Sequence, residues 1–108
     1  MSPTDVKQTI AISSTDTLQK YIGTVATDIG VARIKAVQAQ SSAADASVKI
    51  YNATSASTAS TLVFEAKWGT AANAEFSVKI PANGIYCDTG MYADLTNCDF
   101  LVVTGAFT

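Results

Sequence analysis

The period-two alternation of apolar and polar side chains constrains the fold of this chain more than any other feature. The segment LVFEAKW (62–68) keeps one parity apolar: Leu62, Phe64, Ala66 and Trp68. EFSVKI (75–80) and ASVKIYN (46–52) alternate in the same way. Successive strand side chains face opposite sides, so each segment predicts a strand with one buried and one solvated face, as in antiparallel sheets. No window shows convincing helical periodicity.

Turn signals separate these segments at short, even intervals. Examples are TDIG (27–30), SSAAD (41–45), GTAAN (69–73), PANG (81–84) and DTG (88–90). Short strands spaced in this way predict an all-β antiparallel β-sandwich, jelly-roll or Ig-like, with about eight or nine strands. We expect these strands at 6–13, 20–26, 31–39, 46–52, 61–68, 75–80, 84–87, 91–96 and 100–105.

The rest of the chain fits one domain. We expect residues 1–108 to form a single sandwich, with 1–5 as a flexible N-terminal arm. The run NATSASTAS (52–60) has the composition of a linker, but it lies between two good strands. We therefore expect it to be a hairpin loop, and the most exposed and mobile segment of the chain.

The crowded C-terminal window IPANGIYCDTGMYADLTNCDFLVV combines turn residues with alternation. Pro81 ends a strand because proline cannot donate to a ladder, and Gly84 and Gly90 tolerate positive φ. One parity is expected to face the core: Ile85, Cys87, Met91, Ala93 and Leu95. The other parity carries Tyr86, Asp88, Tyr92 and Asp94.

The charge pattern argues against several classes of partner. Charged residues make up 15% of the chain, against about 25% in typical soluble domains. The seven basic residues are scattered and the net charge is −2, so we expect no nucleic-acid partner, which needs a basic stripe. No apolar run is long enough for a membrane span and no signal peptide is visible. We therefore expect no membrane partner and synthesis in a cytoplasm.

The usual catalytic and cofactor-binding residues are missing. The chain has no histidine, which removes the commonest general base and transition-metal ligand. Cys87 and Cys98 lack the second pair of a zinc site, and no glycine-rich phosphate loop occurs. We expect free, buried thiols at these two positions, with a single disulfide as the alternative. The sequence thus predicts no catalytic residue, no cofactor and no metal.

Two weaker site hypotheses compete with structural roles. Asp88, Asp94 and Asp99 could bind calcium or supply the acid and base of a glycosidase, although turn capping is the favoured role. Trp68, Tyr86 and Tyr92 could form a sugar-stacking platform. The favoured interpretation places Trp68 in the core and the tyrosines at an interface.

From Val31 onward the chain resembles a family of small virion proteins of tailed bacteriophages. The resemblance rests on the strands ARIKAVQAQ, VKIYN and LVFEAKW and on the ending VKIPANGIYCDTGMYADLTNCDFLVV. The most telling positions are those of a glycine-started strand and the strand after it: Pro81, Gly84, Ile85, Gly90, Met91 and Tyr92. Cys87 and Cys98 are not part of the pattern.

The resemblance implies a β-sandwich that decorates or cements a phage head or belongs to the tail, without catalytic residues. We therefore expect a non-enzymatic virion structural protein, assembled in the host cytoplasm, that binds the major capsid protein or another virion protein. A homo-oligomer such as a trimer fits decoration sites. We expect contacts through Met1–Gln19 and through the edge strands. The alternatives are a tail, adaptor or fibre component and a carbohydrate-binding or adhesin module.

Overall fold

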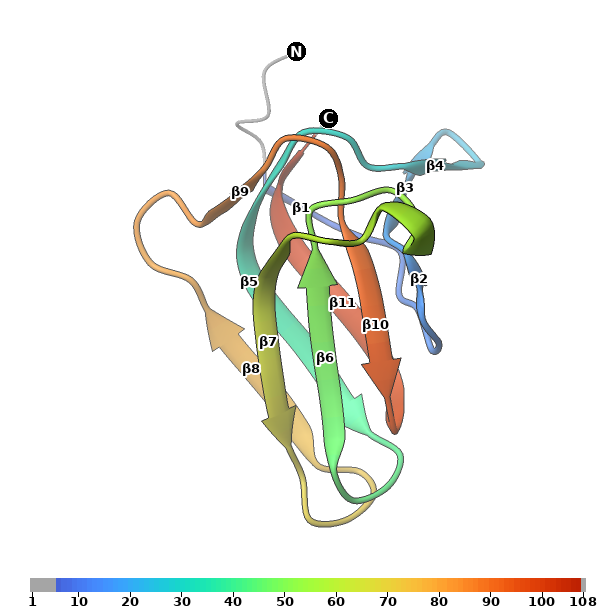
Figure 1. The fold of residues 1–108 in the computed structure, drawn as a ribbon, viewed down its shortest axis with the longest axis vertical. Helices are drawn as coiled ribbons and strands as arrows, with labels where there is room; N and C mark the ends of the chain where they lie inside the picture. The colour runs from blue at the N-terminus through green and yellow to red at the C-terminus, as the bar shows by residue number, and fades with distance from the viewer. Residues whose placement is uncertain (1–5, 108) are drawn as a thin grey trace.

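The computed structural model describes residues 6–107, which form a sandwich of two antiparallel sheets and a separate two-stranded hairpin (Figure 1). The all-β fold class predicted from the alternation is confirmed. The strands are β1 (Val6–Gln8), β2 (Asp16–Thr17), β3 (Gln19–Ile22), β4 (Val25–Asp28), β5 (Ala32–Ser41), β6 (Ala46–Tyr51), β7 (Leu62–Trp68), β8 (Glu75–Lys79), β9 (Ile85–Cys87), β10 (Tyr92–Thr96) and β11 (Cys98–Phe107). Among these described residues, one 3-10 turn, η1 (Ala56–Thr58), lies between β6 and β7.

The first sheet is built around the two longest strands, β5 and β11. Its order is β1-β11-β5-β8, and β9 also pairs with β5. Because β8 pairs with 36–40 of β5 and β9 pairs with 32–34, the two short strands lie end to end along one edge. Gly84 precedes β9 with φ 76°, and a Cβ there would lie 2.2 Å from the carbonyl oxygen of Ile34. Only glycine permits this close approach of the two backbones.

The second sheet has the order β2-β10-β6-β7 and lies in front of the first in Figure 1. The core fills the space between the two sheets, as in other sandwiches. Its fully buried side chains come from both layers and include Ile34, Val37, Val48, Ile50, Met91, Leu101, Val103 and Phe107. Within the described residues, no helix is long and apolar enough to span a membrane.

The N-terminal third differs most from the expected strands. The expected strand 6–13 ends at Gln8, after which only Ile12 forms a bridge, to Leu101. The two-residue strand Asp16–Thr17 was not expected. The expected strand 20–26 is instead a hairpin with Gly23 at its turn. The expected arm, 1–5, lies outside the described residues.

A β-bulge corrects the predicted orientation of Leu62. Ile50 pairs with Phe64 and Tyr51 with Leu62, so Val63 is an extra residue in β7. A bulge shifts the parity of the residues beyond it. Leu62 is therefore 46% exposed, whereas Val63 packs against the core beside Phe64.

The segment 52–60 is a hairpin loop, as predicted, but it is not exposed throughout. Ala53 is buried. The side-chain oxygen of Asn52 accepts hydrogen bonds from the backbone N–H groups of Thr89 (2.9 Å) and Gly90 (3.3 Å). These bonds tie the start of the loop to the turn before β10.

Candidate interaction surface

The three candidate aspartates do not converge. The Asp88 carboxylate accepts hydrogen bonds from the side chains of Asn52 (2.8 Å) and Thr89 (3.0 Å). Both bonds lower the pKa of Asp88, and the bond from Asn52 has the larger effect. Asp94 accepts a hydrogen bond from the Thr15 hydroxyl at 3.1 Å, while Asp99 is exposed. Among residues 6–107, no three Asp, Glu, Cys or His residues lie close enough to hold a metal ion. The geometry therefore favours turn capping over calcium binding for Asp88.

Both cysteines are free and buried, as the sequence favoured. Burial, with a smaller contribution from the nearby Asp88 charge, raises the pKa of the Cys87 thiol to about 11. Burial also raises the pKa of Cys98, whose Sγ lies 3.4 Å from the carbonyl oxygens of Ser47 and Thr96. Because the thiolate is the reactive form, neither cysteine has the properties of a nucleophile.

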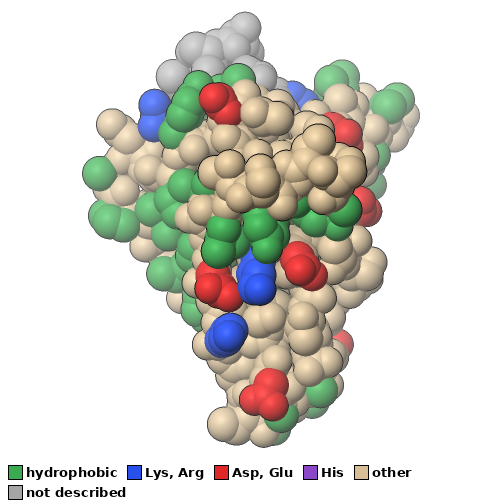
Figure 2. Space-filling model, in the orientation of Figure 1, with side chains coloured by type: hydrophobic (Ala, Val, Ile, Leu, Met, Phe, Trp, Pro, Cys, Tyr) green, Lys and Arg blue, Asp and Glu red, His purple; other side chains and the backbone are tan. Residues whose placement is uncertain are grey.

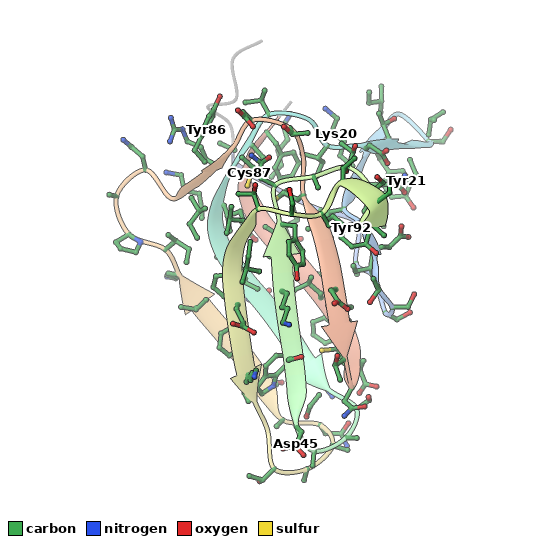
Figure 3. The ribbon with its side chains drawn as sticks, viewed as in Figure 1. Lys20, Tyr21, Asp45, Tyr86, Cys87 and Tyr92 are labelled. Atoms are coloured by element: carbon green, nitrogen blue, oxygen red, sulfur yellow. The ribbon has the colours of Figure 1, made fainter. Side chains whose placement is uncertain are left out.

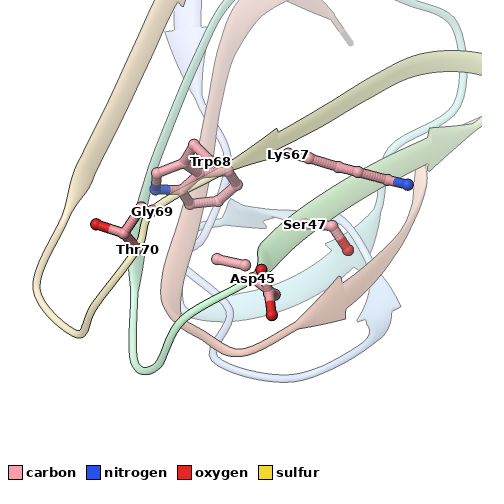
Figure 4. A pocket seen from close by; sticks show the side chains of 7 residues that line it. Asp45, Ser47, Lys67, Trp68, Gly69 and Thr70 are labelled. Atoms are coloured by element: carbon pink, nitrogen blue, oxygen red, sulfur yellow. The ribbon is translucent and has the colours of Figure 1, made fainter.

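The three candidate aromatic side chains lie apart from one another. Trp68 packs on Phe76, with ring centroids 5.1 Å apart, and its indole N–H donates to the carbonyl of Ala74. Tyr86 belongs to the first sheet and lies under the Arg33 guanidinium, while Tyr92 belongs to the second. Figure 3 shows both tyrosines well above Asp45, which lies at the lower end of the molecule. Asp45 and Trp68 line the same depression (Figure 4). They do not form one sugar-stacking platform.

A shallow depression of about 610 Å³ lies beside Trp68 and has the volume of a ligand pocket. Its lining includes one carboxylate, Asp45, and one ammonium group, Lys67. Figure 4 shows the Lys67 and Trp68 side chains pointing in opposite directions, as neighbours in a strand must. Lys67 and Trp68 therefore do not converge on one point of the depression.

The β3–β4 hairpin is the most distinctive surface of the described chain. It belongs to neither sheet and projects from one corner of the sandwich (Figure 1). Its strands pair from Gln19 opposite Asp28 to Ile22 opposite Val25, and the loop between them has only two residues. Gly23 adopts φ 64° at the first loop position, which suits the type II′ turn of tight hairpins.

The base of the hairpin is fixed firmly to the sandwich. Leu18 and Ile29 flank the two strands and are both fully buried in the core. The Leu18 N–H donates to the Met91 carbonyl (2.8 Å), and the Ile29 N–H donates to the Leu18 carbonyl (3.2 Å). The Gln19 amide donates to the Asp28 carboxylate at 2.9 Å across the first pair. The hairpin therefore emerges from the core at a defined position.

The outer part of the hairpin exposes large apolar side chains. Tyr21, Ile22 and Val25 are 63%, 60% and 63% exposed, the highest values among the large apolar residues described. Figure 2 shows apolar side chains at this projecting corner, and Figure 3 places Tyr21 there. Scattered exposed apolar residues are ordinary, but three of them on one short projecting element are typical of a contact surface.

Sequence reasoning missed this surface. The expected contact segment Met1–Gln19 stops just before Tyr21, Ile22 and Val25, and two short parts of it, β1 and β2, pair within the sheets. The available signal was Gly23 between the short alternating runs QKYI and VATD. A glycine at the centre of such a pattern indicates a two-residue hairpin and not one continuous strand.

Comparison of the chain with known protein families, with curated proteins and with solved structures found no match.

Proposed function

We propose that this chain is a non-enzymatic structural protein of a phage virion, a capsid decoration or cement protein that binds the assembled head and stabilises it. The observation that carries the proposal is the anchored hairpin with its exposed Tyr21, Ile22 and Val25. The resemblance of the segment from Val31 onward to small virion proteins supplies the virion context. The partner in this proposal is the major capsid protein.

The stabilising mechanism is thermodynamic. A protein that binds the assembled shell but not its separated subunits stabilises the assembly by the free energy of binding. Many copies on one lattice need only modest affinity each, because every copy contributes its own binding free energy. A compact sandwich with a low density of charge suits repeated packing against a protein surface.

Self-association into a homo-oligomer such as a trimer is part of the proposal. The outer strands β7 and β8 each have one edge without a strand partner among residues 6–107. Such an edge can add to a neighbour's sheet through main-chain hydrogen bonds. Sedimentation of the purified chain over a range of concentrations measures this association directly.

Copy number per particle tests the location within the virion. Quantitative mass spectrometry of purified particles should give on the order of hundreds of copies for a head protein, matching a shell lattice. A dozen copies or fewer would refute the head assignment and favour the tail, adaptor or fibre alternative. The carbohydrate-binding alternative has less support, because Trp68, Tyr86 and Tyr92 do not share one surface.

The stabilising role has its own test. Particles assembled without the chain should open at a lower temperature than complete particles, and adding the purified chain back should restore the difference. Equal opening temperatures in all three samples would refute a cementing role.

A further inference from the structure

We infer that the β3–β4 hairpin inserts into an uncharged, apolar cleft of the shell protein, so that both of its faces are covered. This inference rests on the proposed function and specifies its binding mode.

The apolar side chains lie on both faces of the hairpin. Residues directly opposite each other in an antiparallel pair share a face. Ile22 therefore lies beside Val25 on one face, and Tyr21 lies beside Ala26 on the other. All four are exposed. A flat partner would cover only one of these faces, whereas a cleft covers both.

The exposed area is too small for a stable contact between two copies of this chain. Fully burying an aromatic side chain removes about 200 Å² from water, and an aliphatic one roughly 100 Å². With about 60% of each still exposed, Tyr21, Ile22 and Val25 offer about 250 Å² per copy, or roughly 500 Å² in a symmetric pair. Stable interfaces bury about 1,200–2,000 Å². A cleft in a larger partner supplies additional contacts around the base of the hairpin.

The charge of the hairpin favours a neutral protein cleft. Its two charged residues, Lys20 and Asp28, have opposite signs, so its net charge is zero. Asp28 also accepts a hydrogen bond from Gln19 within the hairpin. Interfacial membrane segments and nucleic-acid contacts rely on clustered lysine and arginine, which the hairpin lacks. Binding should therefore depend little on salt.

The buried base makes the hairpin a preorganised ligand. A two-stranded hairpin alone is marginally stable in water, but Leu18 and Ile29 hold both of its ends in the core. Less conformational entropy is then lost on binding. The hairpin can therefore enter a cleft without first being ordered by the partner.

The test measures binding of the purified chain to particles assembled without it, by co-sedimentation at low and high salt. One variant alters the first face (Ile22→Thr with Val25→Thr), and a second alters the other face (Tyr21→Thr). Threonine suits strands, so the hairpin should persist. The matched control is Val31→Thr, which removes an apolar side chain that is 37% exposed and lies just before β5, outside the hairpin and the outer strands. Circular dichroism and melting temperature verify the fold of each variant.

We expect each face variant to bind about tenfold more weakly, whereas the control binds like the unaltered chain and salt has little effect. If only one of the two face variants binds more weakly, the partner surface is flat, and the inference of a cleft is overturned. Normal binding by both would overturn the inference and leave the proposed function standing.

Two other partners could cover the hairpin, and each would give a distinct result. Concentration-dependent dimerisation of the unaltered chain, lost on Ile22→Thr, would identify a second copy as the occupant and overturn the inference. Binding to anionic phosphatidylserine vesicles that is lost on Tyr21→Thr would identify a membrane as the partner of the hairpin and would also overturn the inference. Failure of the unaltered chain to bind the particles at all would instead refute the proposed function and the inference together.

Discussion

Replacement of Ser41 by alanine tests how the end of the sandwich is held together. Ser41 is the last residue of β5 and is fully buried. Its hydroxyl accepts a hydrogen bond from the Ala74 N–H (2.9 Å) and donates one to the Ala71 carbonyl (2.7 Å). Its backbone makes two more bonds to the same loop, to Ala74 and Asn73. One serine therefore organises the loop between β7 and β8.

The substitution should destabilise the protein by about 2 kcal/mol. The Ala74 N–H is part-buried and loses its partner, and an unsatisfied buried donor costs roughly 1–3 kcal/mol. The Ala71 carbonyl belongs to an exposed residue, so water can replace the lost donor there at little cost. For a domain of this size, the expected fall in melting temperature is about 10 °C.

Trp68 reports the effect of Ser41→Ala from within the loop between β7 and β8. It is the only tryptophan of the chain, and its indole N–H donates to the carbonyl of Ala74 in the same loop. Urea unfolding can be followed by Trp68 fluorescence and by circular dichroism. Both unfolding curves should move to the same lower urea concentration, with an unchanged dependence of the unfolding free energy on urea. Ser42→Ala, which alters an exposed neighbour, is the matched control and should leave the midpoint in place. A shift below about 0.5 kcal/mol for Ser41→Ala would refute the assigned role of the hydroxyl.

Two further predictions concern backbone approach and thiol chemistry. Gly105→Ala should destabilise by at least about 3 kcal/mol or prevent folding, because its Cβ would lie 2.2 Å from the carbonyl oxygen of Arg33. Gly30→Ala, with nothing within 4 Å, should stay within about 1 kcal/mol of the unaltered protein in thermal unfolding; equal effects would contradict the packing at Gly105. The raised pKa of Cys87, about 11 against 9.0, favours the neutral thiol in the folded state. Its contribution to stability should be complete below pH 9 and lost as the pH rises towards 11, and Cys87→Ser should remove that part of the decline. A thiol reagent at pH 8 should label Cys87 and Cys98 only after denaturation, and rapid labelling of the native protein would show that they are accessible.

The strands with unbroken alternation could be predicted from the sequence. The predicted strands 46–52 and 75–80 match β6 and β8 to within a residue, because each has one buried and one solvated face and a clear turn at both ends. The burial of Cys87 and Met91 follows from the same parity rule. These features depend on local patterning alone.

The errors arise where tertiary contacts decide the local structure. The bulge at Val63 results from how β7 pairs with β6, and no residue of LVFEAKW signals it. The two residues of β2 form a strand only because β10 offers them an edge. The hairpin was missed because Ile22 and Val25 fit a single strand as well as two.

The candidate site was less predictable than the fold. Parity identifies the side chains of a sheet that face the core, but the hairpin belongs to neither sheet and has no core face. The exposure of Tyr21 therefore depends on where Leu18 and Ile29 enter the core. That position is set by residues distant in sequence, such as Met91.

The central position of β11 has a consequence for how this protein is made on the ribosome. β11 separates β1 from β5 in the first sheet, yet Cys98–Phe107 are synthesised after every other described strand. Until they leave the exit tunnel, β1 has no neighbour and one edge of β5 stays open. Nascent chains with unpaired strands are prone to aggregation, and pairings between distant segments form slowly. The first sheet can therefore close only after β11 has left the ribosome, and chains released before Leu101 and Val103 are added should be degraded and not accumulate as soluble protein.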